Sequence, residues 1–569
     1  MAGPRLIQWG CAVAVLFGLT YGIGGHVLLE PDEGRNAEIA REMAETNSFV
    51  LPRLNGLPYL DKPALYFATG AVAMKAFGIN ATAARLPSLV FTVLTLAVVV
   101  LLGYTMFGSE GAWTAGIAFG ASPFTVTYAR VVIFDSALTF FVTLSCAAFF
   151  FASEAVHRSN GNVDEDYGVP LGGPVAWSVI AWAAIGLGIL TKGPVALVLP
   201  LLVIGPYAAW RGTLRTLFEP VGLLTCVAIV LPWVLAIERR IPGFLRYVSV
   251  VETGERLFTD RLGRSEPLWY FLPIMLGAAF PWTGVVLAGL RGLRRGAASS
   301  WDRRTVFLSL WIVLPLLLFT LSQSKRPQYI LPLVPAVALL VARMWSRVCG
   351  RMPGATAAGA GLSVLGLVLA SSARWLPSIF ETTDAVRAAI PPTALTLGAV
   401  SGVAGLVTVT VARYRYAVLL ACALPVTAIP LIGGPLLRAI AEDRSAAGLV
   451  KAIRPALTAE TELIAVGVYP LSLSFYAGRT VLLATLDGRE LTSNYVARHM
   501  DQLRRIPNTT LRPANWWLEA LVLCDRPRVF IVPAEATAIR NRLRMLPLLA
   551  ETRKVAAYGP CGRPDLAVR

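Results

Sequence analysis

Apolar blocks dominate the chain as far as about residue 433, and short polar segments, many of them rich in arginine, separate these blocks. A helix needs about 20 apolar residues to cross a bilayer. The pattern therefore predicts a bundle of transmembrane helices. The candidate spans are 7–29, 64–78, 84–107, 111–128, 131–153, 175–190, 193–210, 217–237, 267–289, 305–321, 328–343, 354–372, 392–411 and 416–433.

The segment 64–78 is the doubtful span, because it is short, follows Pro63 and carries Lys75. If the N-terminus is cytoplasmic and this segment does not cross, the arginine-rich loops fall on the cytoplasmic side, as the positive-inside rule requires. If the segment crosses, that bias inverts. We therefore predict thirteen spans, with 64–78 interfacial or partly inserted. The arginines that decide this are Arg211, Arg215, Arg291, Arg294, Arg295, Arg303, Arg304, Arg343, Arg347, Arg351, Arg413 and Arg415.

After residue 434 the pattern is that of a small α/β domain. The stretches ELIAVGVY, RTVLLAT and RVFIVP are typical of buried strands, and helical stretches are expected at 445–457, 493–505 and 534–544. The predicted fold is thus mostly α, with a polytopic transmembrane helical domain over 1–433 and a soluble α/β domain over 434–569. An odd number of spans places this second domain outside the cytoplasm, where an oxidising compartment permits a disulfide between its two cysteines, Cys524 and Cys561.

The composition agrees with a membrane protein. The chain is 56% hydrophobic and 15% charged, with a mean hydropathy of +0.62, whereas soluble domains contain about 25% charged residues. The net charge of +17 follows from the positive-inside rule, so nucleic acid is not an expected partner. Only three histidines are present and no CxxC pair occurs, which argues against a histidine-built or thiolate metal centre.

Polar residues collect in four predicted outer loops, 30–62, 128–136, 238–266 and 322–329. The cations in these loops break the positive-inside trend, so orientation does not explain them. Ionisable residues at a membrane face are costly and usually functional. Acids and cations that converge on one face favour a site for a lipid phosphate.

The first outer loop contains a helix that we expect to begin at Asp32. A step of about 100° per residue places Asp32, Arg35 and Asn36 on one stripe with Ile39 and Met43, while Glu38, Arg41 and Glu45 are expected to face water. A plain interfacial helix capped by Asp32 is the alternative. It leaves Arg35 unexplained, because a cation in the first turn opposes the helix dipole unless it pairs with Asp32 or binds an anion.

Three other residues also allow two interpretations. Lys62 is either a phosphate ligand or a snorkelling lysine at the membrane edge. Tyr59 is either a ligand or an interfacial anchor. Asp135 is either an inward carboxylate or an ordinary helix cap.

Together the motifs DEGRNAEIA, LDKPALYF, RVVIFDSALTFF, LTKGP, LPW, ETGERLF, PLWYF, SQSKRPQYILPLVP and LSLSFYAGR extend over essentially the whole chain. The chain resembles the bacterial aminoarabinose transferases that modify lipid A, which are polytopic glycosyltransferases of the GT-C superfamily. The sequence departs from this family at Ala64, where relatives often have a second proline, and at Arg264, where related enzymes carry a histidine.

The resemblance implies that Asp32 is the key carboxylate and Asp135 a second acidic position. It assigns the donor phosphate to Arg35, Tyr59 and Lys62. The region of Glu252, Arg256 and Phe258 is then the long outer loop that orders over the bound lipid. Contacts to lipid or to the acceptor phosphate are expected from Arg256, Lys325, Arg326 and Tyr329.

The implied activity is transfer of 4-amino-4-deoxy-L-arabinose from undecaprenyl phosphate to a lipid A phosphate, which gives resistance to polymyxin and other cationic peptides. The enzyme is expected to be a monomer in the bacterial inner membrane with its active site on the periplasmic side. No cofactor is assigned, and a divalent metal is left open. A protein O-mannosyltransferase-like enzyme and a transporter of lipid-linked sugars are the alternatives, although no repeated halves typical of a transporter are evident.

Overall fold

The computed structural model describes residues 2–159, 172–249, 266–287, 302–347, 353–379 and 382–561. Contacts within the chain divide it into two compact units. The helical unit comprises Met1–Ile23 and Arg85–Leu436, and the mixed unit comprises Gly24–Ala84 and Leu437–Arg569. The predicted membrane domain included the loop 30–62. By its contacts, this loop belongs to residues 24–84, called the first outer segment below, which group with the C-terminal residues.

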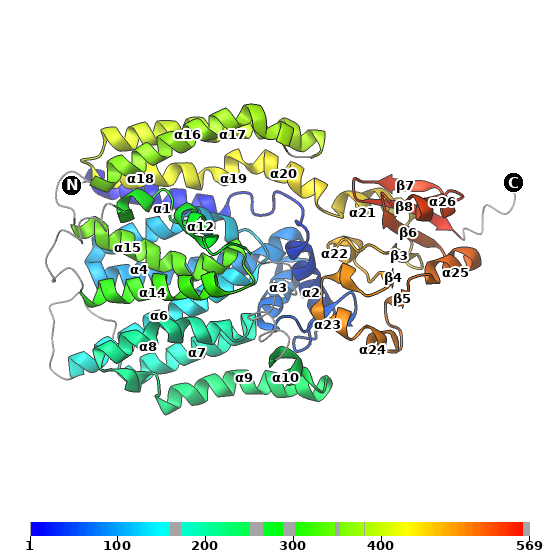
Figure 1. Cartoon of the computed structure of the whole chain (residues 1–569), viewed down its shortest axis with the longest axis horizontal. Helices are drawn as coiled ribbons and strands as arrows, with labels where there is room; N and C mark the ends of the chain where they lie inside the picture. Colours follow the sequence, from blue (N-terminus) through cyan, green and yellow to red (C-terminus); the bar gives the residue numbers. More distant parts are fainter. Residues whose placement is uncertain are drawn as a thin grey trace. The chain divides into compact units, whose positions relative to one another are not determined.

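The helical unit consists of long apolar helices that run roughly alongside one another (Figure 1). In the described part of the chain, nine helices are long and apolar enough to cross a membrane, and three shorter apolar helices accompany them. The elements are α1 (Ala2–Thr20), α4 (Ala81–Gly120), α5 (Pro123–Tyr128), α6 (Phe134–Ser159), α7 (Pro174–Lys192), α8 (Val195–Arg211), α9 (Pro220–Arg240), α12 (Phe271–Ala278), α14 (Arg303–Leu321), the 3₁₀ helix η4 (Pro327–Leu333), α15 (Val334–Arg347), α16 (Pro353–Ile379), α17 (Asp384–Thr410), α18 (Arg415–Thr427), α19 (Ile429–Ile432) and α20 (Gly434–Asp443).

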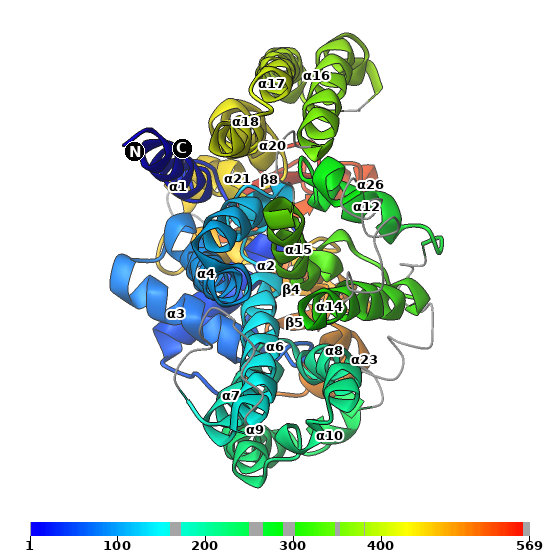
Figure 2. The ribbon, with the colours of Figure 1, turned by 90° about the vertical axis from the view of Figure 1, so that its left-hand side faces the viewer.

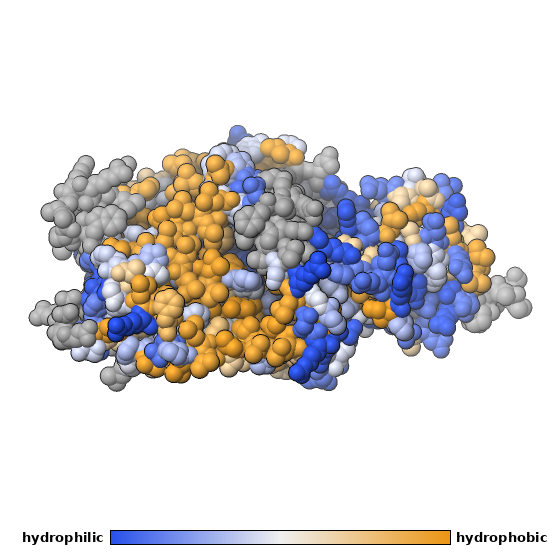
Figure 3. Space-filling view, turned by 60° about the horizontal axis from the view of Figure 1, so that its bottom comes forward, coloured by the Kyte–Doolittle hydropathy of each residue, from blue (hydrophilic) through white to orange (hydrophobic). Residues whose placement is uncertain are grey.

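Burial differs strongly between these helices. The most apolar windows of α6 and of residues 327–345 are 89% buried, but that of residues 214–240 is only 17% buried. The end-on view shows α4, α6 and α15 inside this unit, with α9 and the α16–α17 pair at opposite edges (Figure 2). On the face shown in Figure 3, apolar side chains form a broad area over the helical part of the chain, as expected for contact with lipid.

The predicted spans 84–107 and 111–128 are separate helices, although α4 is continuous by hydrogen bonding. Gly108 has φ 73° and ψ −166°, which interrupts the helix. A Cβ on Gly103 would lie 2.7 Å from the carbonyl oxygen of Gly111. Residues eight apart in a straight helix are about 12 Å apart, so the chain reverses at Gly108 and the two parts pack as a hairpin. The first predicted span, in contrast, is shorter than expected, since α1 ends at Thr20.

Two arginines show that the first outer segment leaves and re-enters the helical unit at the same end. Arg85, near the start of α4, donates from Nη1 to the carbonyl oxygen of Ile23 at 2.9 Å. Arg130, which follows α5, donates to the carbonyl oxygen of Tyr21. The end of α1 and the start of α4 are therefore neighbours. Helix α3 (Leu65–Phe77) has 13 residues and would span about 20 Å, less than the roughly 30 Å of a bilayer core.

The mixed unit contains a six-stranded sheet with the order β5-β4-β3-β6-β8-β7. Strands β3 (Glu462–Val466), β4 (Leu482–Thr485), β5 (Leu511–Pro513) and β6 (Arg528–Pro533) are parallel, and β8 (Val555–Cys561) and β7 (Leu548–Glu551) complete one edge in antiparallel pairing. The predicted strands and the α/β class are confirmed. The intervening helices are α21 (Ala447–Ile453), α22 (Leu473–Ala477), α23 (Asn494–Arg498), α24 (Met500–Arg504), α25 (Trp516–Leu523) and α26 (Thr537–Arg542), with 3₁₀ helices η5 (Arg454–Ala456) and η6 (Arg489–Leu491).

The first outer segment packs on this α/β part through α2 (Asp32–Thr46) and a short hairpin of β1 (Arg53–Leu54) and β2 (Leu57–Pro58). Asn55 in the hairpin turn is fully buried. Its side-chain amide donates to Val481 O and accepts from Val481 N, both at 2.8 Å, as a neighbouring strand would. This pairing ties residues 24–84 to the start of β4.

The prediction that Glu38 and Arg41 face water is wrong. Glu38 is 0% and Arg41 2% exposed. The guanidinium of Arg41 donates to both carboxylate oxygens of Glu38, at 2.7 and 2.8 Å, and also to Glu45 at 2.5 Å. Burial alone would lower the pKa of Arg41, but Glu38 and Glu45 outweigh it and raise that pKa. Paired charges allow this face of α2 to be buried against protein.

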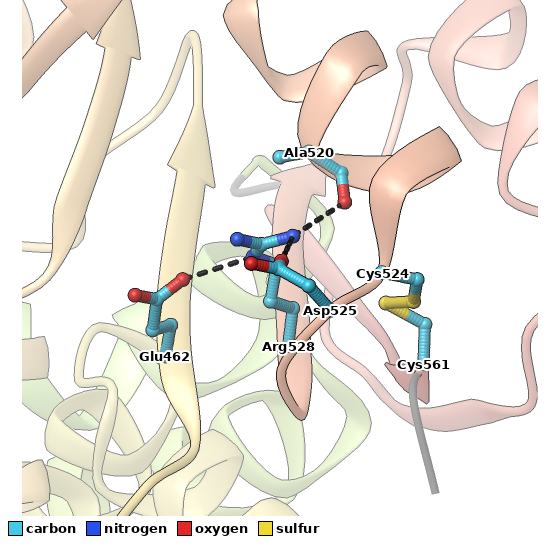
Figure 4. Close-up of a disulfide and its surroundings, with 6 residues drawn as sticks. All are labelled: Glu462, Ala520, Cys524, Asp525, Arg528 and Cys561. Atoms are coloured by element: carbon cyan, nitrogen blue, oxygen red, sulfur yellow. Dashed lines mark hydrogen bonds and ion pairs between the residues drawn. A yellow bond between two sulfur atoms is a disulfide. The ribbon is translucent and has the colours of Figure 1, made fainter.

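The disulfide expected in the C-terminal domain is present between Cys524 and Cys561, with Cα atoms 5.8 Å apart. It joins the end of α25 to the end of β8 (Figure 4). Beside it, Arg528 donates to Glu462 at 2.9 Å, to Asp525 at 2.7 Å and to the carbonyl oxygen of Ala520 at 2.9 Å. The bridge and this ionic group fasten the same end of the domain.

Candidate functional site

The candidate residues form two groups, one in each unit. Asp32, Arg35, Tyr59 and Lys62 belong to the mixed unit, while Asp135, Lys325, Arg326 and Tyr329 belong to the helical unit. Arg256 and its neighbours Glu252 and Phe258 lie outside the described residues.

In the mixed unit, Asp32 and Arg35 form an ion pair, which is one of the two explanations that the sequence left open for a cation in the first turn. Asp32 is the first residue of α2 and does not cap it, because Pro31 occupies the cap position. Arg35 Nη2 donates to Asp32 Oδ1 at 2.5 Å, and the two side chains are 13% and 28% exposed, respectively. Asp32 is thus the more accessible member of the pair.

The charge of Arg35 is fixed by its surroundings. Burial on its own would lower the pKa of Arg35, but the nearby Tyr59, Asp32 and Asp61 outweigh it and raise that pKa. Tyr59 is 3% exposed, and its ring packs edge-on against Phe67 at 5.9 Å between centroids. Such packing fixes the orientation of the Tyr59 ring. An interfacial anchor does not need a buried ring with a fixed orientation.

Lys62 follows directly after this group and does not extend into solvent. Its Nζ donates to the carbonyl oxygen of Asp61 at 2.6 Å, and the residue is half-buried. The Asp61 carboxylate accepts from the backbone N–H of Asn494 at 2.8 Å and of Tyr495 at 3.0 Å. The backbone that carries Lys62 is thereby held by the start of α23.

The C-terminal domain contacts α2 and its flanks through the loops after β3 and β4. Glu30 accepts from the backbone N–H of Ser472 at 2.9 Å and from its hydroxyl at 2.5 Å. Burial raises the pKa of Glu30, and the Ser472 bonds and the charge of Lys554 offset part of that rise. Arg35 Nη1 donates to Thr492 Oγ1 at 3.0 Å. Loops at the carboxyl ends of parallel strands are a common location for binding sites in open α/β sheets.

In the helical unit, Asp135 lies in the first turn of α6 and its side chain is 3% exposed. It forms an ion pair with Lys192, the last residue of α7. Lys192 Nζ also lies 5.2 Å from the centre of the Tyr329 ring. The structure thus brings together Asp135 and Tyr329, both predicted, through a lysine that was not predicted. A buried carboxylate paired with a lysine is better suited to a site than to a simple helix cap.

The remaining candidates of the fourth outer loop have separate contacts. Lys325 is 7% exposed and donates from Nζ to the carbonyl oxygen of Glu266 at 2.8 Å. Arg326 is the residue that precedes the 3₁₀ helix η4, in which Tyr329 lies. Lys325 therefore fastens the loop that carries Tyr329.

Sequence reasoning missed Lys192, Asp61 and Thr492. The motif LTKGP contained a signal for Lys192, since a lysine that ends an apolar helix before Gly-Pro is placed at a membrane face. Asp61 adjoins Lys62 in LDKPALYF. Thr492 had no signal, because its partner Arg35 is 457 residues away in the sequence. Among the described residues, no group of three or more His, Cys, Asp or Glu could hold a metal ion.

Comparison with known proteins supports the resemblance that the motifs indicated. The family profile for dolichyl-phosphate-mannose-protein mannosyltransferase matches residues 28–248. The undecaprenyl phosphate-alpha-4-amino-4-deoxy-L-arabinose arabinosyl transferase 1 of Pseudomonas fluorescens is 33% identical over 345 residues, 59% of each chain. The corresponding transferase of Edwardsiella ictaluri is 30% identical over 63% of this chain and 62% of its own. The chain thus aligns with about 60% of the length of these curated relatives.

The fold similarity extends over the full length. The crystal structure of ArnT from Cupriavidus metallidurans bound to undecaprenyl phosphate superposes with a TM-score of 0.83, at 23% identity and 100% coverage of both chains. Its apo form gives a TM-score of 0.81. The predicted fold class, a polytopic helical domain followed by a small α/β domain, is therefore confirmed.

Proposed function

We propose that this chain, a polytopic membrane protein of the GT-C superfamily of glycosyltransferases, transfers 4-amino-4-deoxy-L-arabinose from undecaprenyl phosphate to a phosphate of lipid A. The observation that carries the proposal is the cationic group of the first outer segment. Arg35 pairs with Asp32 at 2.5 Å and donates to Thr492 at 3.0 Å, and Lys62 lies in the same segment and donates to the carbonyl oxygen of Asp61. This segment lies within the stretch that the family profile matches.

In the proposed reaction the bond between the anomeric carbon and the donor phosphate oxygen breaks. The electron pair stays on undecaprenyl phosphate, and a lipid A phosphate oxygen forms the new bond to the anomeric carbon. Negative charge develops on the leaving phosphate, and Arg35 and Lys62 are preorganised cations that stabilise it. Tyr59 donates a hydrogen bond to the same oxygens.

Asp32 has no proton to remove in this reaction. A phosphate monoester has a second pKa of about 6, so the acceptor is already anionic near neutral pH. We assign to Asp32 the orientation of Arg35, with which it pairs at 2.5 Å, and contact with the cationic amine of the sugar. Asp135 and Lys192 form a second charged pair, and we propose that this pair, with Tyr329, contacts the substrates. Lys325, Arg326 and Arg256 stay proposed lipid or acceptor contacts.

We further propose that the chain acts as a monomer in the bacterial inner membrane, with the donor site and the C-terminal domain in the periplasm. Capping of lipid A phosphates with a cationic sugar would reduce the binding of polymyxin and other cationic peptides. A metal requirement is not part of the proposal.

The mannosyltransferase profile over residues 28–248 favours one second candidate, transfer of a hexose to Ser or Thr of a protein. A hydroxyl acceptor must lose a proton, so Asp32 would then act as a general base. The pairing with Arg35 at 2.5 Å occupies Asp32 Oδ1, which favours the first candidate.

The test is transfer by the purified protein from undecaprenyl-phosphate aminoarabinose. Wild-type protein should modify lipid A, should not modify lipid A whose phosphates have been removed, and should not modify a Ser/Thr peptide. Asp32→Asn should lose about a hundredfold in rate with a smaller change in donor binding than Lys62→Ala. Modification of the peptide and not of lipid A would select the second candidate.

A further inference from the structure

Thr492 has an unusual backbone conformation for its residue type. It follows η6 with φ 52° and ψ 30°, in the left-handed helical region. The other non-glycine residues with positive φ in the described chain are three asparagines, Asn47, Asn55 and Asn508, and Cys524. Asparagine tolerates this region, whereas a β-branched residue there is an outlier that costs free energy. Such strain persists mainly where a functional constraint maintains it.

The hydroxyl of Thr492 supplies a reason for the strain. It accepts a hydrogen bond from Arg35 Nη1 at 3.0 Å, while Arg35 Nη2 donates to Asp32. Two residues thus hold two nitrogens of one guanidinium. Arg35 Nε is buried without a hydrogen-bond partner. The hydrogen bonds to Thr492 and Asp32 therefore set the plane of the Arg35 guanidinium. The plane decides whether a guanidinium can bind phosphate through two parallel hydrogen bonds.

The residues after Thr492 hold the second cation of the site. Ser493 caps α23, and the backbone N–H groups of Asn494 and Tyr495 donate to the Asp61 carboxylate. Lys62 Nζ in turn donates to the carbonyl oxygen of Asp61. One short segment of the C-terminal domain, residues 492–495, therefore fixes both Arg35 and the backbone of Lys62. Its geometry depends on the turn at Thr492.

We propose that Thr492 is a positioning residue through which the C-terminal α/β domain orients Arg35 for the donor phosphate. The inference rests on the proposed function, in which Arg35 binds that phosphate. Glycine at this position would relieve the strain, but it has no hydroxyl to accept the hydrogen bond from Arg35. The C-terminal domain is then part of the donor site.

Three substitutions separate the hydroxyl from the strain. Thr492→Ser keeps the hydroxyl and should stay within about twofold of wild type in kcat/KM. Thr492→Val keeps the branched shape and should lose about tenfold, as expected for a hydrogen bond to a charged group. Thr492→Gly should lose a similar factor, because relief of the strain does not replace the lost hydroxyl. Asn508→Gly, at an exposed turn with φ 58°, is the matched control and should leave transfer unchanged.

Binding of undecaprenyl phosphate alone to the purified, full-length variants gives a readout that does not require turnover. The proposal predicts that Thr492→Gly and Thr492→Val weaken binding about tenfold, that Thr492→Ser does not, and that Arg35→Ala weakens it more. If Arg35→Ala loses binding but Thr492→Gly and Thr492→Val bind as wild type, the positioning role is wrong and the proposed function stands. If Arg35→Ala binds normally, the phosphate role of Arg35 fails, and the role of Thr492 fails with it.

Discussion

At the scale of single residues, Lys62 separates the functional interpretation from the structural one. A snorkelling lysine extends toward water, but the Lys62 ammonium turns back to the carbonyl oxygen of Asp61 at 2.6 Å. Asp61 also interacts electrostatically with Arg35. The contact therefore places the ammonium of Lys62 beside a residue that lies near the Asp32–Arg35 pair. This contact favours the proposed role of Lys62 at the donor phosphate over that of an anchor.

Lys62→Ala should therefore lower the transfer rate by about a hundredfold or more, because a preorganised charge that stabilises the leaving phosphate is lost. Lys62→Arg should restore only part of the rate, since a planar fork does not replace an ammonium. Lys75→Ala, an exposed lysine on α3 of the same unit, is the matched control and should be near wild type. The measurement is the initial rate of transfer by purified variants with unchanged melting behaviour. Equal rates for Lys62→Ala and wild type would make Lys62 an anchor.

The Asp32–Arg35 pair was predictable, because the partners are one helical turn apart and a cation in the first turn needs an anion. Lys192 was not predicted to meet Asp135, since the two are 57 residues apart and lie on different helices. The contact between Thr492 and Arg35 could not be predicted for the same reason, because 457 residues separate them. Spacing along the chain reveals neighbours within one helix, whereas contacts between elements depend on how those elements pack.

At the scale of elements, most helices and strands followed from hydrophobic periodicity. The error on α2 arose because the helix carries as many charges as a solvated one, yet Glu38 and Arg41 neutralise each other in the interior. The edge strands β5 and β7 were missed because segments of three and four residues have little periodicity. Strand β8 was missed because it contains Gly559 and Pro560, which are typical of turns. The close packing of α16 on α17 was also not foreseen. It depends on glycines, which patterns of apolar residues do not distinguish.

Gly398 on α17 tests that packing. A Cβ there would lie 2.7 Å from the carbonyl oxygen of Gly366 on α16 and 2.9 Å from the backbone nitrogen of Ala370, while a Cβ on Gly402 would meet nothing within 4 Å. Membrane helices use small residues at such contacts. Gly398→Ala should destabilise the protein by about 1–3 kcal/mol, and Gly402→Ala should not. The check is the apparent melting temperature in detergent, and equal values for the two variants would contradict the tight contact.

At the scale of the whole molecule, the contacts of the helical unit agree with the predicted alternation of its spans. Glu154 pairs with Arg211 and Arg303, and Asp302 pairs with Arg343, and the predicted topology places all of these residues at the cytoplasmic end. Asp135, Lys192 and Tyr329 meet at the other end. The number of spans stays a prediction, since in the described chain several predicted spans are short or broken helices.

The direction of insertion is tested with a reporter. An alkaline phosphatase fused after Arg569 should be active, because it folds only after export, and a fluorescent protein that requires the cytoplasm should stay dark at the same position. A reporter pair fused after Arg413 should give the opposite result and serves as the control, since the positive-inside rule keeps that loop inside. Cytoplasmic activity after Arg569 would overturn both the parity of spans and the periplasmic site.

The central proposal concerns the product, and mass spectrometry of lipid A tests it most directly. Cells that make undecaprenyl-phosphate aminoarabinose but lack their own transferase would express the wild-type chain, the Lys62→Ala variant or neither. The proposal predicts lipid A carrying aminoarabinose on phosphate only with the wild-type chain, and at most about a hundredth of that amount with Lys62→Ala when both are present at equal levels. Unmodified lipid A in cells that contain folded wild-type protein and donor would contradict the proposed function.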